Sequence, residues 1–187
     1  MRAVRSCAAA VLAAGSGVRM GGPKAELVLD GIRLLDRAVA AAADAGCAPV
    51  YAVVRSGTEV IGADAVLNPE PERGMRSSLA LAVEAAADVA ALAVVLVDTP
   101  GITAPGVRAV VDAWRPGRIA VARYGTRRGH PIVMAPQLWR AALDLAGPDE
   151  GARAFLAARP ELVDDVDVPG DPSDLDTPDD LARWQPG

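Results

Sequence analysis

The chain has 187 residues, of which 51% are hydrophobic and 3% aromatic, and its formal net charge is −5. This length is typical of one folded domain with a sizeable core, and we expect a single domain over residues 1–187. The few aromatic side chains and the negative charge argue against a surface for nucleic acids or anionic membranes. The longest apolar runs, such as 89–97, are about half as long as a membrane span.

Strand and helix signals alternate along the chain. The predicted strands cover 7–13, 49–55, 64–67, 93–97, 118–123, 130–134 and 162–168. The predicted helices cover 33–46, 75–88, 104–114, 136–145, 149–158 and 178–184. The stretch 94–97 is apolar without alternation, as in a central parallel strand covered on both faces. This order predicts an α/β fold, a three-layer α/β/α sandwich with a mostly parallel, Rossmann-like sheet.

The N-terminus imitates a secretory signal, because Arg2 and Arg5 precede an apolar stretch. That stretch runs directly into the turn at 15–17, however, which is the pattern of a strand followed by a loop. Cys7 and Cys47 are far apart in the sequence and form no C-x-x-C pair, which indicates a reducing compartment and no zinc cluster. We therefore expect a cytoplasmic protein.

The segment 12–24 carries most of the chemical information. It leaves a predicted strand and has three glycines within seven residues, followed by Lys24, the only lysine beside 18 arginines. Exposed backbone N–H groups with two cations, Arg19 and Lys24, form an anion cradle suited to a triphosphate. A tight turn without a ligand is the alternative.

Two familiar phosphate-binding motifs do not fit this segment. Gly17 and Gly22 have the spacing of a P-loop, but Pro23 intervenes and Ala25 replaces the hydroxyl that would hold Mg²⁺. The glycines are also one residue too widely spaced for the dinucleotide fingerprint G-x-G-x-x-G. An oxidoreductase domain is therefore disfavoured.

The stretch LAAGSGVRMGGPK at 12–24 resembles the L-A-[AG]-G-x-x-x-R-M-G-x-x-K signature of the MobA-like nucleotidyltransferases. That family contains the molybdenum cofactor guanylyl- and cytidylyltransferases. Four further segments resemble other motifs of this family in order and spacing. They are NPEPERGMRSSL at 68–79, VVLVDTP at 94–100, GHPIV at 129–133 and DLDTPDDL at 174–181. The resemblance covers essentially the whole chain and implies a nucleotide-diphospho-sugar transferase-like fold. The last two motifs resemble the cytidylyltransferase branch.

The resemblance implies a nucleotide site built from the glycine-rich segment and the turn at 74–78. Its members are Leu12, Ala13, Ala14, Gly15, Ser16, Gly17, Arg19, Lys24, Gly74, Ser77 and Ser78. Ser78 would lie close to the base, whereas the structural alternative makes Ser77 and Ser78 helix-capping residues. The run Ala13-Ala14-Gly15 in place of Ala-Gly-Gly favours CTP over GTP.

Asp98 ends a buried apolar strand, where an ionised carboxylate needs a cation. Its natural role is that of a Mg²⁺ ligand, because attack at an α-phosphate needs a metal to neutralise charge on the phosphate oxygens. The alternative is that Asp98 caps the helix that begins near Thr103. In the metal-free protein we expect Asp98 to lack a cationic partner, so that replacing it by Asn leaves folding intact.

The C-terminal motif at 174–181 contains four aspartates. Asp174 and Asp176 alternate in an extended stretch, so both face one side, and either of them would complete the metal site with Asp98. Asp179 and Asp180 fall in the first turn of a helix capped by Thr177, where a structural role is expected.

His130 follows the cluster of Arg123, Arg127 and Arg128. A substrate phosphate is already an anionic nucleophile, so the reaction does not require a histidine base. We assign Arg127, Arg128 and His130 to an acceptor-phosphate and loop-ordering site. A solvated basic loop is the alternative.

The resulting hypothesis is a single Mg²⁺-dependent nucleotidyltransferase domain. A phosphorylated acceptor attacks the α-phosphate of an NTP and releases pyrophosphate, with Arg19, Lys24 and Asp98 as catalytic residues. The resemblance implies a molybdopterin-type acceptor and contact with a molybdoenzyme or its chaperone, with sugar phosphates and other small phosphorylated acceptors as alternatives. A nucleotide-binding accessory protein without turnover is another alternative, and it needs no paired carboxylates.

Overall fold

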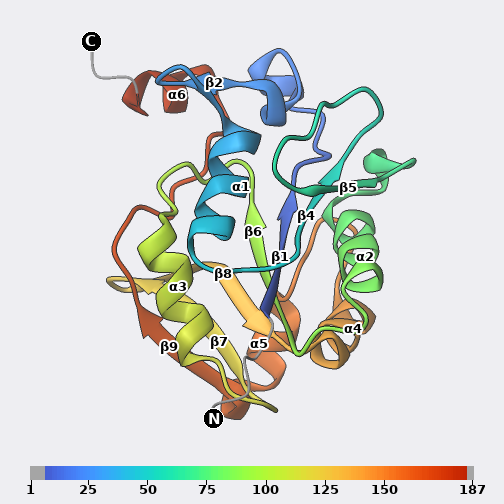
Figure 1. The fold of residues 1–187 in the computed structure, drawn as a ribbon, viewed down its shortest axis with the longest axis vertical. Helices are drawn as coiled ribbons and strands as arrows, with labels where there is room; N and C mark the ends of the chain where they lie inside the picture. The colour runs from blue at the N-terminus through green and yellow to red at the C-terminus, as the bar shows by residue number, and fades with distance from the viewer. Residues whose placement is uncertain (1–6, 185–187) are drawn as a thin grey trace.

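A computed structural model describes residues 7–184, so Arg2 and Arg5 lie outside the described residues. A seven-stranded sheet forms the centre of the molecule (Figure 1). Across the sheet the strands are β5 (Asp64–Leu67), β4 (Val50–Val54), β1 (Cys7–Leu12), β6 (Ala91–Leu96), β8 (Arg127–Met134), β7 (Ile119–Tyr124) and β9 (Val163–Asp167). Neighbouring strands are parallel except at β8, which is antiparallel to β6 and β7. The expected mostly parallel sheet is confirmed, and the N-terminal apolar stretch forms its strand β1, between β4 and β6.

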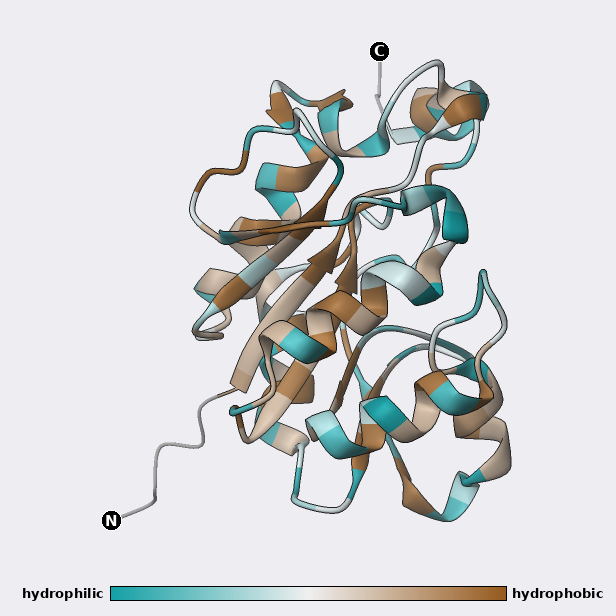
Figure 2. Cartoon of the chain, turned by 90° about the vertical axis from the view of Figure 1, so that its right-hand side faces the viewer, coloured by the Kyte–Doolittle hydropathy of each residue, from teal (hydrophilic) through white to brown (hydrophobic). Residues whose placement is uncertain are grey.

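Helices cover both faces of the sheet. One face packs against α1 (Leu34–Asp44) and α3 (Ala104–Ala113), and the other against α2 (Met75–Ala85), α4 (Pro136–Leu145) and α5 (Arg153–Ala158). Side chains of β1 alternate between the two cores, with Ala9 and Val11 in one and Ala8 and Ala10 in the other. Figure 2 shows hydrophobic residues concentrated on the strands and on the inner sides of the helices. The predicted three-layer sandwich is therefore confirmed.

Several short elements were not predicted. A hairpin of β2 (Val28–Leu29) and β3 (Ile32–Arg33) turns at Asp30 and Gly31, which both have positive φ. Single 3₁₀ turns are η1 (Val18–Met20), η2 (Lys24–Glu26), η3 (Pro71–Arg73) and η4 (Pro160–Leu162). Two-residue strands and single turns are too short for a hydrophobic period to show.

The cysteines, far apart in the sequence, are neighbours in the fold. Both are buried and free, and the Cys7 thiol interacts with Cys47, which together with burial raises the pKa of Cys7. Within residues 7–184, no helix combines the length and hydrophobicity needed to span a bilayer.

The sheet order places a crevice at the carboxyl ends of β1 and β6. β4 and β5 follow β1 on one side in the sheet, whereas β6, the next strand in the chain, pairs with β1 on the opposite side. In the β1 and β6 pair, Leu12 lies opposite Leu96. Loops that leave such a switch point diverge and leave room for a ligand. The segment before α6 (Pro178–Trp184) crosses the same end, because the N–H of Leu175 donates to the carbonyl of Asp98 at 2.8 Å.

Candidate active site

The glycine-rich segment after β1 forms a compact turn around η1. Gly17 and Gly21 have φ values of 58° and 79°, in the left-handed region that favours glycine. A Cβ on Gly17 would stand 1.9 Å from the carbonyl oxygen of Gly22, so no larger residue fits there. The N–H of Gly22 donates back to the carbonyl of Gly17 at 3.3 Å. This turn leads directly into Lys24.

Lys24 joins two carboxylates from distant parts of the chain. Its Nζ lies 2.7 Å from Oδ2 of Asp98 and 2.6 Å from Oδ1 of Asp176. Burial alone would lower the pKa of Lys24, but the hydrogen bonds to Asp176 and Asp98 raise it above its ordinary value. The hydrogen bond from Lys24, with a smaller contribution from the charge of Arg19, lowers the pKa of Asp176. Lys24 and Asp176 are therefore charged at neutral pH.

The expectation that Asp98 lacks a cation in the metal-free protein is wrong, because the Lys24 ammonium takes that place. Asp98 does not cap the following helix either. The N-cap of α3 is Thr103, whose side chain accepts a hydrogen bond from the N–H of Gly106 at 3.3 Å. The side chain of Asp98 is thus committed to the Lys24 cluster.

Asp174 lies beside the same cluster. Burial, followed by the negative charges of Asp98 and Asp176, raises the pKa of Asp174. Leu175, between the two aspartates, is fully buried in the core. The alternation predicted from the sequence therefore places both aspartates on the side of Asp98.

The carboxylates fit a divalent metal only in part. In the described residues, no group of three or more His, Cys, Asp or Glu side chains could hold a metal ion, so Asp98, Asp174 and Asp176 do not form a complete ligand set. Asp98 and Asp176 nevertheless converge on one cation position, now taken by an ammonium. Mg²⁺ typically uses one or two carboxylates together with substrate phosphates and water. The pair fits a metal that arrives with a nucleotide.

The first turn of α6 holds the backbone of Asp176 by a hydrogen bond. Oδ2 of Asp180 accepts hydrogen bonds from the N–H of Asp176 at 3.0 Å and from the N–H of Thr177 at 2.8 Å. The N–H of Asp180 donates in turn to Oγ1 of Thr177 at 3.3 Å. This reciprocal capping confirms the structural role predicted for Thr177 and Asp180.

A cavity of about 310 Å³ opens beside Lys24. It brings together Asp98 and most of the predicted nucleotide-binding residues, namely Leu12, Ala14, Gly15, Ser16, Lys24, Gly74 and Ser78. Ala13 does not line it, because its side chain is buried in the core and 1% exposed. Gly17, Arg19 and Ser77 do not line it either. Gly17 instead shapes the loop.

Met75, Glu72 and Asp149 also line this cavity and were not predicted as site residues from the sequence. A Cβ on Gly74 would stand 2.4 Å from both the carbonyl oxygen of Pro148 and Oδ1 of Asp149. Gly74, with a φ of 86°, thus allows the loop before α5 to close against the start of α2. No local sequence signal marks Asp149, because this contact joins segments far apart in the chain.

Ser77 and Ser78 do not cap α2, whose N-cap is Gly74 with no side-chain hydrogen bond. Both hydroxyl oxygens instead accept hydrogen bonds of 2.9 Å from the side-chain amide of Asn68. Asn68 is 2% exposed and lies at the end of β5. Asn68 belongs to the motif at 68–79, and both of its partners lie in the first turn of α2.

The sequence matches the family model described as the MobA-like NTP transferase domain over residues 9–164. The chain belongs to the MobA-like NTP transferase family. The resemblance seen in the motifs is confirmed, and the family places the chain among the nucleotidyltransferases. The matched stretch contains Lys24 and Asp98, whereas Asp174 and Asp176 follow it.

Relatives of this MobA-like chain span almost its full length. Nicotine blue oxidoreductase of Paenarthrobacter nicotinovorans is 35% identical in an alignment 190 residues long, and the alignment covers 92% of this chain and 93% of that protein. The crystal structure of an Rv0371c homologue from Mycobacterium sp. strain JC1 is 28% identical, with a TM-score of 0.81 and coverages of 95% and 96%. Rv0371c of Mycobacterium tuberculosis H37Rv in complex with manganese is 24% identical, with a TM-score of 0.77 and coverages of 96% and 97%.

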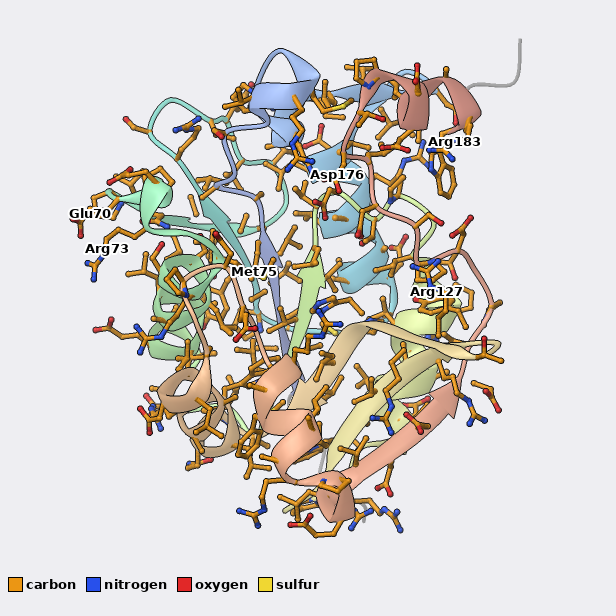
Figure 3. The ribbon with its side chains drawn as sticks, turned by 180° about the vertical axis from the view of Figure 1, so that it is seen from behind. Glu70, Arg73, Met75, Arg127, Asp176 and Arg183 are labelled. Atoms are coloured by element: carbon orange, nitrogen blue, oxygen red, sulfur yellow. The ribbon has the colours of Figure 1, made fainter. Side chains whose placement is uncertain are left out.

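A second cavity of this MobA-like transferase, of about 550 Å³, adjoins the first through Met75 and Leu96, which line both. The predicted acceptor residues Arg127, Arg128 and His130 line it. Arg153, Leu156 and Asp174 line it as well. Figure 3 shows Met75 and Arg127 on opposite sides of this region, with Asp176 above them. The two cavities therefore meet beside the Lys24 cluster.

The arginines before His130 differ in their partners. Arg123 forms a two-pronged ion pair with Asp167, at 2.7 and 2.8 Å. Arg128 forms one with Asp165, at 2.6 and 2.9 Å. Both pairs tie the β7 and β8 hairpin to β9. Arg127 forms no ion pair with any residue from 7 to 184, but its charge acts on the carboxylates of Asp171 and Asp174. Its side chain lines the second cavity.

His130 is fixed within the sheet. Its Nδ1 lies 3.1 Å from the carbonyl oxygen of Val94, and because a carbonyl only accepts, Nδ1 carries a hydrogen. Burial lowers the pKa of His130, against the opposing effects of that hydrogen bond and the charge of Asp98. A neutral imidazole contributes no positive charge, so Arg127 is better suited than His130 to bind a phosphate.

Proposed function

We propose that the protein is a Mg²⁺-dependent nucleotidyltransferase that transfers a nucleoside monophosphate from an NTP to a phosphorylated small molecule and releases pyrophosphate. The observation that carries this proposal is the convergence of Lys24, Asp98 and Asp176 at the edge of the glycine-rich loop. A nucleotide-binding accessory protein would need the loop but not the carboxylate pair. The whole chain, 1–187, would act as one cytoplasmic domain.

In this proposal the cavity of about 310 Å³ holds the nucleotide. Backbone N–H groups of the loop face the triphosphate, and the turn from Gly74 to Ser78 forms the wall beside the base. Ala14 and Gly15 belong to the cytidylyltransferase-like form of the motif and line the cavity, which favours CTP over GTP.

Each charged residue of the site would stabilise a different part of the bound nucleotide and metal. When bound, Mg²⁺ held by Asp98 and Asp176 would offset negative charge on the phosphate oxygens. Lys24 holds the two carboxylates together before the nucleotide arrives, and its ammonium would then turn to the triphosphate. Arg19, exposed on the loop, would contact the leaving pyrophosphate.

The second cavity would bind the acceptor. Its lining includes the apolar side chains of Met75, Leu96 and Leu156 and the exposed cations of Arg127 and Arg153. This combination of apolar and cationic side chains suits a small phosphorylated molecule, and a molybdopterin-type acceptor is the candidate that the family resemblance implies. Contact with a molybdoenzyme or its chaperone would follow from such an acceptor.

A second candidate function is suggested by the 35% identity with nicotine blue oxidoreductase over nearly the full length of both chains. In that case a reduced dinucleotide would bind through its pyrophosphate in the same glycine-rich loop. The G-x-G-x-x-G spacing is not met, and oxidoreduction gives no role to the pairing of Asp98 with Asp176.

The test is a screen of the four NTPs with phosphorylated acceptors, with and without Mg²⁺, in which released pyrophosphate is measured. We expect release only when Mg²⁺, acceptor and nucleotide are all present, and fastest with CTP. Oxidation of NADH or NADPH by candidate acceptors is measured in parallel. Nicotinamide oxidation without pyrophosphate release would favour the second candidate, and NTP binding without either reaction would favour the accessory protein.

A further inference from the structure

Two of the three buried polar side chains in the described residues are hydrogen-bonded to each other beside the nucleotide cavity. Asn68 is 2% exposed and Ser78 is 6% exposed, while the third, Thr99, lies elsewhere on the crevice. Burying a polar group costs free energy unless its hydrogen bonds are satisfied. Each donor and acceptor of this pair can therefore be accounted for.

The orientation of the Asn68 amide follows from its backbone partner. One side-chain atom lies 2.9 Å from the backbone N–H of Glu70, and because an N–H only donates, that atom is the oxygen. Nδ2 then faces α2, with one hydrogen for Oγ of Ser77 and one for Oγ of Ser78, both at 2.9 Å. The donors of Asn68 are fully used.

The two serines are left in different states. Ser77 donates its own hydroxyl hydrogen to the carbonyl of Gly74 at 2.8 Å, so it is committed within the turn. The oxygen of Ser78 accepts from Asn68, and among residues 7–184 the structure gives no acceptor for its hydrogen. Ser78 lines the nucleotide cavity. The cavity is therefore where this hydrogen can be donated.

We propose that Asn68 is a positioning residue that makes Ser78 a hydrogen-bond donor toward the bound nucleotide. The inference rests on the proposed function, which places the NTP in this cavity. A fixed donor selects an acceptor atom on the ligand, such as a carbonyl oxygen or an unprotonated ring nitrogen of a base. Cytosine presents both side by side, whereas uracil carries a hydrogen on the corresponding ring nitrogen.

The test reverses this hydrogen bond. Asn68→Asp preserves the size of the side chain, but an ionised carboxylate only accepts, so Ser78 would donate to residue 68 and present a lone pair to the cavity. Calorimetry with Mg²⁺ gives the Kd of CTP for wild type, Asn68→Asp, Ser78→Ala and the double variant. We expect Asn68→Asp to weaken binding by roughly tenfold when Ser78 is present, and by about twofold or less in the Ser78→Ala background.

Equal weakening in both backgrounds would mean that residue 68 affects binding without Ser78, through the fold or through the added charge, and would overturn the inference. No weakening in either background would overturn it as well. If wild type binds none of the four NTPs, the proposed function fails, and the inference with it.

A measurement that needs no variant of Asn68 uses nitrogen-15 spectra of its side-chain amide. CTP should shift these signals in wild type and not in Ser78→Ala, and a shift that survives in Ser78→Ala would contradict the inference.

Discussion

Lys24 occupies the position at which the two carboxylates of the site converge. Its ammonium lies within 2.7 Å of Asp98 and 2.6 Å of Asp176, so a metal cannot bind both carboxylates until Lys24 moves away. A triphosphate supplies both a new partner for the ammonium and further ligands for the metal. We therefore expect metal and nucleotide to bind together.

Lys24→Met should separate the two roles of this lysine. Without the ammonium, Mn²⁺ should bind the free protein roughly tenfold more tightly, while kcat/KM for pyrophosphate release falls by about two to three powers of ten. Mn²⁺ titration followed by electron paramagnetic resonance measures the first effect. Arg115→Gln, which removes one charge far from the site, is the control. Unchanged Mn²⁺ affinity in Lys24→Met would contradict this expectation.

The sequence identified Lys24, Asp98 and Asp176 as chemically important, but it did not predict that they pair. An anion cradle and a metal ligand were expected separately, because a linear sequence carries no distance between a loop after β1 and a segment before α6. Asn68 shows the same limit. Its buried amide is recognisable only once Ser77 and Ser78, nine and ten residues further on, are placed against it.

At the scale of elements, the turn after β1 depends on the close approach of Gly17 to Gly22. Gly17→Ala should force the turn open, because its Cβ would meet a carbonyl oxygen at 1.9 Å. We expect NTP binding to weaken by about tenfold or more, since the backbone N–H groups would no longer converge.

The matched control for Gly17→Ala is Gly21→Ala. Gly21 also has a positive φ, 79°, but a Cβ there meets nothing within 4 Å. It should therefore carry only backbone strain of about 1 kcal/mol and retain most of its nucleotide affinity. Equal Kd values for the two variants in calorimetric NTP titrations would show that the close approach of Gly17 is unimportant.

The predicted helices and strands are all found, with small shifts at their ends. The largest shift is at α5, which begins at Arg153 and not at 149, because the preceding residues form a loop that closes against Gly74. The direction of β8 was not predicted. Only Gly125 and Thr126 separate β7 from β8, and so short a connection requires an antiparallel pair.

At the scale of the whole molecule, the far edge of the sheet is held by ion pairs between β9 and arginines. Arg118 contacts Asp164 at 3.0 and 2.5 Å, and its hydrogen bonds, together with one from Arg115 at 3.0 Å, lower the pKa of Asp164 from 3.8 to about 2. A carboxylate with a lowered pKa stabilises the fold above its ordinary pKa, and this stability is lost as pH falls toward the lowered value. The edge should therefore weaken between pH 3.8 and about 2.

Urea unfolding at several pH values in this window tests the edge. Wild type should lose more stability on acidification than Arg118→Gln, because the variant keeps Arg115 but has already lost the largest interaction that lowers the pKa of Asp164. Since Arg118 and Asp164 are close to solvent, the difference should shrink at high salt. Parallel pH profiles of wild type and variant would contradict this account of the edge.

Asp98→Asn tests the central claim most directly, because Asp98 belongs to both the Lys24 cluster and the proposed metal site. Melting temperature and pyrophosphate release are measured on the same preparation with Mg²⁺, CTP and acceptor. Lys24 keeps Asp176 as a partner, so the variant should lose about 1 kcal/mol of stability and a few degrees in melting temperature. Turnover should fall by several powers of ten, since a misplaced metal affects both the attacking and the leaving oxygens. A folded Asp98→Asn protein with undiminished pyrophosphate release would contradict the account.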